Sequence, residues 1–188
     1  ARNRGIETAE GNFIQFVDAD DFLLTSAYEQ CLDIIRYREA DMVLFRATSS
    51  TSSVPQPEAE GPVTGTEYMT HHNLHASAWT YLFRKAILHD LRFTKDTLHE
   101  DEEFTPLLML RVENLYVTEG KAYHYRIRKD SITHRTDRRW KMRRLSDAEQ
   151  VIYRLKEKAD YLPVKERIAM DRRIAQLTMD HIYNVMTL

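Results

Sequence analysis

The sequence has 188 residues, of which 43% are hydrophobic and 30% charged, and its formal net charge is −2. This length and composition suit a globular domain with a real core, and no apolar run is long enough to cross a bilayer. The single cysteine, Cys31, excludes an internal disulfide and fits a reducing cytosol; we expect it in the core.

Positive charge is concentrated in one stretch of the chain. Residues 121–144 hold ten basic residues against Asp130 and Asp137, which leaves this stretch at about +8 and the remainder at about −10. Such a stretch indicates a phosphate-bearing ligand or an anionic surface, or alternatively a solvated helix start. No nucleic-acid-binding motif accompanies it, so we expect no nucleic-acid partner.

Hydrophobic spacing predicts an α/β chain that becomes wholly helical towards its C-terminal side. The first expected elements are a helix over 2–10 closed by Gly11, a strand over 13–17, a helix capped by Thr25 or Ser26, and a strand over 41–47. A rim loop over 48–62, a helix over 65–73 and a strand over 77–83 are expected next. A short helix over 84–89, a helix over 100–112 and two short strands over 115–118 and 121–128 follow. From Asp137 onward two helices are expected, with a break near Leu162-Pro163. Their apolar stripes are Leu145, Ala148, Ile152 and Leu155, and Ile168, Ile174, Leu177, His181 and Val185.

The strand over 13–17 runs directly into Asp18, Asp20 and Asp21. Residues two apart in a strand point to the same side, so Asp18 and Asp20 are expected to share one target. Converging carboxylates repel each other unless a cation or hydrogen-bond donors lie between them, and Mg²⁺ or Mn²⁺ prefers such oxygen ligands. The alternative is that Asp20 or Asp21 only caps the next helix, and Asp21 is the member expected to be structural.

The residues ARNRGIETAEG at 1–11, followed by Phe16-Val17-Asp18-Ala19-Asp20-Asp21, resemble the middle of a family 2 glycosyltransferase of the GT-A fold. The resemblance implies a DXD motif in which Asp18 and Asp20 bind Mn²⁺ or Mg²⁺, with Arg2 and Asp18 contacting the nucleotide. It also implies that a nucleotide-binding half precedes this stretch. We therefore expect residues 1–135 to form the C-terminal part of a GT-A (nucleotide-diphospho-sugar transferase, Rossmann-like) domain, and 136–188 a helical C-terminal extension.

A second acidic cluster occurs in His99-Glu100-Asp101-Glu102-Glu103-Phe104. Acidic residues are favoured at a helix N-terminus for electrostatic reasons alone, which is the simpler interpretation. Preceded by Trp79-x-Tyr81-Leu82-Phe83-Arg84-Lys85, the cluster also resembles the family segment that carries the catalytic base. By that resemblance Asp101 is the base, with Glu100 as its alternative.

The stretch Tyr123-His124-Tyr125-Arg126 continues to Ser131-Ile132 and resembles the segment that closes the catalytic domain in bacterial family members. Alternation predicts Tyr123 and Tyr125 on one face and His124 and Arg126 on the other. The resemblance implies that Arg126 and Ser131 contact the diphosphate and that His134 is a further metal ligand, unless His134 is an ordinary surface histidine. Trp79 is expected to flank the sugar or acceptor, or else to be a core aromatic.

The resemblance as a whole implies an inverting, metal-dependent glycosyltransferase acting in bacterial surface polysaccharide synthesis. Its partners would be a nucleotide-sugar donor, most simply a UDP-sugar, and a saccharide or lipid-linked acceptor. The basic C-terminal helices are expected to offer peripheral membrane or homodimer contacts at the inner face of the cell membrane. Two other interpretations of the acidic clusters stay open: a non-catalytic helical interaction module, and a metal-dependent phosphohydrolase.

Overall fold

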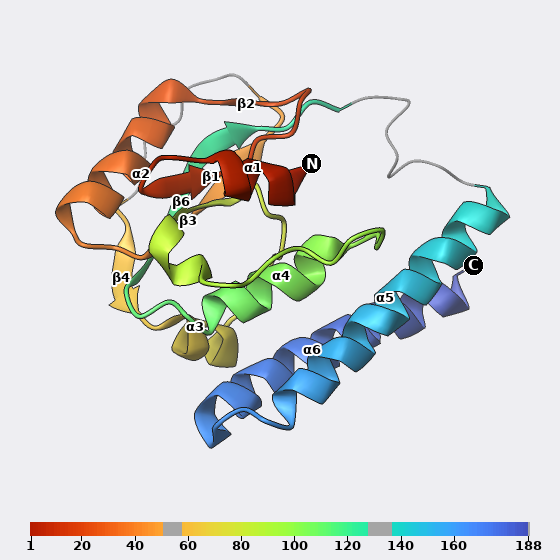
Figure 1. Cartoon of the computed structure of the whole chain (residues 1–188). Coiled ribbons are helices and arrows are strands. Elements are labelled where there is room, and N and C mark those ends of the chain that lie inside the picture. Colours follow the sequence, from red (N-terminus) through yellow and green to blue (C-terminus); the bar gives the residue numbers. More distant parts are fainter. Residues whose placement is uncertain (51–57, 128–136, 188) are drawn as a thin grey trace. The chain divides into compact units, whose positions relative to one another are not determined.

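The computed structural model describes residues 1–50, 58–127 and 137–187. They form two compact units, each assembled from segments that are distant in the sequence (Figure 1). Unit 1 comprises Ala1–Gly65, Ser77–Leu91 and Arg111–Ile127, and unit 2 comprises Thr66–Ala76, Arg92–Leu110 and Arg128–Leu188. The predicted domain boundary at residue 135 lies outside the described residues and stays a prediction.

Unit 1 is built around a mixed β-sheet. Its elements are α1 (Arg2–Thr8), β1 (Phe13–Gln15), β2 (Phe22–Leu23), α2 (Thr25–Tyr37), β3 (Met42–Thr48), β4 (Glu60–Val63), β5 (Tyr81–Arg84), a 3₁₀ turn (Lys85–Leu88) and β6 (Leu115–His124). The strand order is β1-β5-β3-β6-β2, and β4 also pairs with β6. The central β3–β6 pair is parallel, whereas β1–β5, β3–β5, β2–β6 and β4–β6 are antiparallel.

The core of unit 1 lies between α2 and the sheet. Ala27, Cys31 and Ile35 recur every four residues on α2 and are buried, in one cluster with Val43 and Phe45 of β3. Burial raises the pKa of the Cys31 thiol to about 12, so this side chain is an unreactive core residue, as the sequence predicts.

Unit 2 is helical. It contains α3 (Gly65–His71) apart from its first residue, α4 (Glu100–Met109), α5 (Arg138–Ala159) and α6 (Val164–Met186), and Figure 1 shows α5 and α6 as a long antiparallel pair. The Asp137 side chain accepts a hydrogen bond from the Trp140 N–H at 2.9 Å and so caps α5. The predicted break is confirmed, because α5 ends at Ala159 and α6 follows Pro163.

The predicted pair of strands near Gly120 is in fact one strand. β6 continues through Glu119 and Gly120 because β3 pairs with it from Leu115 to His124, with register irregularities near Arg46. The Arg46 guanidinium also forms a two-bond ion pair with the Glu119 carboxylate, at 2.7 and 2.9 Å. A ladder that extends over the turn-like sequence therefore overrides its local preference.

Other predicted boundaries also shift. Neither Thr25 nor Ser26 caps α2: its N-cap is Leu24, whose N–H bonds to the Ala122 carbonyl because β2 leads the chain from the sheet into the helix. On α6 the buried face contains Ala169, Met170 and Arg173, whereas the predicted stripe members Ile168 and Val185 are exposed. Several elements are shorter than predicted: α1 ends at Thr8 with Ala9 as its C-cap rather than at Gly11, β1 ends at Gln15, β5 begins at Tyr81 and α4 ends at Met109. The predicted rim loop over 48–62 is wrong at its end, because β4 begins at Glu60 and pairs with β6.

None of the helices in the described part of the chain is long and apolar enough to cross a membrane.

Candidate functional site

The acidic residues after β1 lie in a turn. β1 pairs with β5 only as far as Gln15, whose side-chain amide then donates to the carbonyls of Phe16 at 2.7 Å and Trp79 at 3.1 Å in place of ladder bonds. The Asp21 N–H donates to the Asp18 carbonyl at 3.0 Å, which closes the Asp18–Asp21 turn. The strand-alternation argument for Asp18 and Asp20 is therefore wrong, although both still follow β1 directly.

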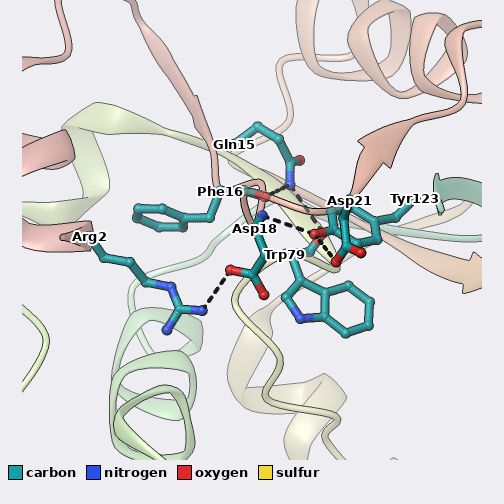
Figure 2. A network of polar contacts seen from close by, with 7 residues as sticks. All are labelled: Arg2, Gln15, Phe16, Asp18, Asp21, Trp79 and Tyr123. Carbon is teal, nitrogen blue, oxygen red and sulfur yellow. Dashed lines mark hydrogen bonds and ion pairs between the residues drawn. The ribbon is translucent and has the colours of Figure 1, made fainter. Parts of the chain in front are cut away.

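The Tyr123 hydroxyl of β6 holds both ends of this turn. It accepts a hydrogen bond from the Asp18 N–H at 3.1 Å and donates one to the Asp21 carboxylate at 2.8 Å (Figure 2). Burial of the hydroxyl is the main reason why the pKa of Tyr123 is raised, so it stays a donor at physiological pH. The Arg126 N–H donates to the other oxygen of Asp21 at 2.8 Å. Asp21 therefore has the structural role that the sequence predicts.

Stacked aromatic rings hold the Tyr123 side chain in place. The Trp79 ring stacks on Tyr123 with centroids 4.6 Å apart and lies 6.1 Å from the Tyr125 ring. His124 points to the other side and stacks on Phe22 of β2 at 4.3 Å. The predicted alternation of Tyr123 and Tyr125 against His124 is thus confirmed, and Trp79 belongs to the packing that fixes the turn.

Arg2 of α1 reaches the turn from the N-terminal side. Its guanidinium lies 3.3 Å from the Asp18 carboxylate, and the two side chains are 24% and 42% exposed (Figure 2). A partly exposed pair of this kind contributes little stability, since solvent screens it. It does bring together two of the residues that the sequence predicts to contact a nucleotide.

The predicted metal ligands are described only in part. Asp18 and Asp20 belong to one turn, and their oxygen donors suit Mg²⁺ or Mn²⁺, but Asp21 is occupied by Tyr123 and Arg126. Within 1–50, 58–127 and 137–187, no group of three or more His, Cys, Asp and Glu side chains could hold a metal ion. His134 and Ser131 lie outside the described residues. The two carboxylates therefore fit part of a ligand set, and the metal remains a prediction.

The second acidic cluster begins α4 in unit 2, and its members Glu102 and Glu103 bind arginines. Glu103 is buried and accepts hydrogen bonds from Arg154 of α5 at 2.8 Å and from the Thr94 hydroxyl at 2.9 Å. Glu102 pairs with the buried Arg173 of α6, which also donates to the Leu74 carbonyl at 2.7 Å. Glu102 and Glu103 thus anchor α4 to the helical pair.

His99 forms the N-cap of α4 in the left-handed conformation, with φ 64° and ψ 33°. Its Nε2 accepts a hydrogen bond from the Arg144 guanidinium at 3.4 Å. Burial first, and then the nearby Arg144 charge, lower the pKa of His99, so the neutral imidazole is favoured here. The left-handed region is uncommon for non-glycine residues, although histidine adopts it more readily than most.

Sequence reasoning missed three structural residues of these sites. The Tyr123 hydroxyl gave no local signal, because its two partners lie more than 100 positions away. Arg173 was detectable, since it occurs three residues after Met170 and four before Leu177, on the apolar side of α6. The partner of Arg154 could not be identified from the sequence, because the two residues lie on different helices.

Residues 1–58 match the family model described as Glycosyl transferase family 2. Among curated proteins, the chain is 28% identical over 149 residues to the uncharacterized glycosyltransferase YibD of Escherichia coli, covering 71% of this chain and 43% of that protein. It is 25% identical over 133 residues to the poly(ribitol-phosphate) β-N-acetylglucosaminyltransferase TarS of Staphylococcus aureus, covering 69% of this chain and 23% of TarS. The chain spans less than half the length of these relatives.

Solved structures show the same fold. The crystal structure of S. aureus TarS 1–349 in complex with UDP-GlcNAc superposes with a TM-score of 0.70 at 20% identity, over 97% of this chain and 52% of that one. The predicted fold, part of a GT-A domain followed by C-terminal helices, is therefore confirmed. The family match at the Asp18–Asp21 turn, the named glycosyltransferase relatives and this fold agree with one another: residues 1–58 are similar to glycosyl transferase family 2, and most of the chain is similar to named glycosyltransferases.

Proposed function

We propose that the protein carrying this chain transfers a sugar from a nucleotide-diphosphate donor to a hydroxyl of a saccharide or lipid-linked acceptor, with inversion at the anomeric carbon. The observation that carries the proposal is the turn after β1, where Tyr123 and Arg126 bind Asp21 while Asp18 meets Arg2. The family match covers this turn. Relatives named for teichoic acid synthesis and for poly(ribitol-phosphate) modification support a role in bacterial surface polysaccharides.

The donor would bind at the Asp18–Asp21 turn. Asp18 and Asp20 would hold Mn²⁺ or Mg²⁺, with His134 as a further ligand, and such an ion stabilises the charge that grows on a leaving diphosphate. Arg2, Arg126 and Ser131 would contact the nucleotide diphosphate, because guanidinium and hydroxyl groups suit phosphate oxygens. The TarS complex contains UDP-GlcNAc, which makes a UDP-sugar the first donor to test.

The acceptor hydroxyl must lose its proton as it attacks, which requires a nearby carboxylate. We assign this role to Asp101, with Glu100 as the alternative, because the run from His99 to Phe104 resembles the family segment that carries the catalytic base. Both candidates are half-buried on the first turn of α4, where the family segment carries its base.

The protein is proposed to work in the cytoplasm, at the inner face of the membrane. The first turns of α5 present the exposed side chains of Arg138, Arg139, Met142 and Arg143. Cationic side chains around an exposed apolar one suit an anionic lipid surface. The long α5–α6 pair is also the part proposed to form homodimer contacts.

The test is turnover of a nucleotide-sugar panel with Mn²⁺, using Asp20→Asn and Asp101→Asn variants. Asp101→Asn should lower kcat by roughly 10²–10⁴, the usual contribution of general base catalysis, with the far-UV CD spectrum unchanged. Asp20→Asn should abolish turnover, and addition of Mn²⁺ should not restore it. Glu119→Gln, which alters an exposed carboxylate paired with Arg46, is the control and should keep wild-type rates.

Three outcomes distinguish the proposed function from its alternatives. Turnover within tenfold of wild type in Asp101→Asn would contradict the assignment of the base. Release of phosphate from nucleotides without an acceptor would favour a phosphohydrolase. No turnover and no effect of Mn²⁺ on stability would favour a non-catalytic interaction module.

A further inference from the structure

Unit 2 contains a cavity of about 380 Å³, and none of the site residues predicted from the sequence lines it. It lies among the N-terminal half of α5, the C-terminal half of α6 and the first turn of α4. Small-molecule sites in proteins begin at about this size. Every lining residue belongs to unit 2 and to its described part.

The cavity combines an apolar floor with a rim of hydrogen-bonding groups. The floor consists of Leu145, Ala148, Val151, Ile152 and Leu177. The rim contains carboxylate, amide and hydroxyl groups from Asp180, Asn184 and Thr187 on the last turns of α6 and the residue that follows them. The Asn184 amide donates to the Asp180 carbonyl and the Thr187 hydroxyl to the Tyr183 carbonyl, so these side chains offer a ligand their oxygen atoms as acceptors. Within the described residues, the buried Nδ1 of the half-buried His181 has no hydrogen-bond partner. A ligand with both hydroxyl groups and C–H surface would satisfy such a lining.

The charges of the lining oppose one another. The lining contains the cations Lys141 and Arg144 and the carboxylates Glu102 and Asp180, and the lowered pKa of His99, caused first by burial, favours its neutral imidazole. Arg144 already donates to His99. The lining thus offers no concentrated positive charge for a phosphate, which favours a neutral, polyhydroxylated ligand over an anionic one.

The cavity begins at the turn that carries the proposed base. His99 and Glu102, on either side of Asp101 in the sequence, both line it. Arg173 connects the two features: it pairs with Glu102, and the charges of Asp180 and Asp101 also act on it. A general base must come within hydrogen-bond reach of the hydroxyl that it deprotonates, so an acceptor bound here would be held close to α4.

We propose that this cavity is the acceptor subsite and that it binds a neutral saccharide unit, with Asp180 and Asn184 bonding its hydroxyls and Ala148 and its neighbours packing against its C–H face. The inference rests on the proposed glycosyl transfer, to which it adds the class and the place of the acceptor.

Replacement of two different alanines by phenylalanine gives a matched pair of variants for the test. Ala148→Phe fills the cavity from α5, whereas Ala175→Phe adds the same side chain on an exposed position of α6 that does not line it. Asn184→Ala, at an exposed rim position, is the second cavity variant and tests the same subsite without overpacking. All three are made in the protein that carries this chain.

The first measurement is the binding of a panel of methyl pyranosides in the absence of donor. Saturation-transfer NMR detects this binding. The wild type and Ala175→Phe should bind at least one glycoside, Ala148→Phe should lose at least tenfold in affinity, and Asn184→Ala at least threefold. Equal affinity in the wild type and both cavity variants would overturn the proposal. So would binding of glycerol 3-phosphate, tested alongside, but of none of the glycosides.

The second readout separates the subsite from the activity. With a donor that turns over, both cavity variants should raise the KM for the acceptor by these factors and leave slow hydrolysis of the donor unchanged. Unchanged acceptor KM with intact transfer would overturn the subsite and leave the proposed function standing. A third outcome is that the protein turns over no donor but still binds a glycoside, and that Ala148→Phe removes this binding. That outcome would support the subsite and contradict the proposed transferase activity.

Discussion

Replacement of Tyr123 by Phe tests how the acidic turn is built. The substitution removes only the hydroxyl and keeps the buried ring stacked against Trp79. Two hydrogen bonds are lost, one from the Asp18 N–H and one to the Asp21 carboxylate. A neutral bond contributes about 0.5–1.5 kcal/mol and one to a charged group about 1.5–3 kcal/mol. Because both aspartates are half-buried and water can replace the hydroxyl, we expect a loss of about 2 kcal/mol in the free energy of unfolding, the low end of that sum.

The assay is urea denaturation followed by the near-UV signal, with Tyr125→Phe as the matched control. Tyr125 lies on the same face, near the same Trp79 ring, and its hydroxyl makes no hydrogen bond among the described residues. The control should change stability by less than about 0.5 kcal/mol, as most substitutions away from such features do. Equal stability of Tyr123→Phe and wild type would refute the view that this hydroxyl holds the turn. If the turn is also the donor site, Tyr123→Phe should raise the KM for the nucleotide sugar while Tyr125→Phe leaves it unchanged.

Three further changes test other parts of the structure. Glu39→Gly should stabilise the protein by about 0.5–1 kcal/mol, because Glu39 has φ 51° directly after the C-cap of α2, where glycine is preferred. Arg154→Ala should cost about 3 kcal/mol, since it leaves the Glu103 carboxylate buried without its charged partner. Stability should fall as the pH drops from 7 to 5: the folded state lowers the pKa of His99, so the unfolded chain binds more protons there. Urea denaturation measures the first two, and a pH series of the same experiment measures the third.

Each of these changes has a matched control. Glu29→Gly makes the same substitution inside α2 and should destabilise by about 1 kcal/mol, so stabilisation by both would contradict the conformational argument. Lys156→Ala removes an exposed cation of α5 and should change stability by less than about 0.5 kcal/mol, so an effect equal to that of Arg154→Ala would refute the importance of burial. His99→Asn tolerates the left-handed backbone and should flatten the pH dependence between 7 and 5, whereas an unchanged slope would exclude His99 as its source.

Local sequence alone determined most helices and the acidic ends of the elements. The four-residue spacing of Ala27, Cys31 and Ile35 predicted the buried face of α2, and Pro163 marked the division between α5 and α6. The order of the acidic motifs at Asp18 and Asp101 was enough to indicate the family. These features depend on neighbours within one or two turns, which a linear pattern contains.

Only the tertiary structure showed which members of the second acidic cluster are structural, and it supplied the physical reason for the structural role that the sequence predicts for Asp21. Asp21 is occupied because Tyr123 lies beside it in space, and Glu102 and Glu103 are occupied because Arg173 and Arg154 approach from other helices. Nothing in the run Glu100-Asp101-Glu102-Glu103 distinguishes its members, since all four suit a helix N-terminus equally well. A carboxylate becomes structural when a distant donor replaces its water, and that donor is brought to it only by the packing of the fold.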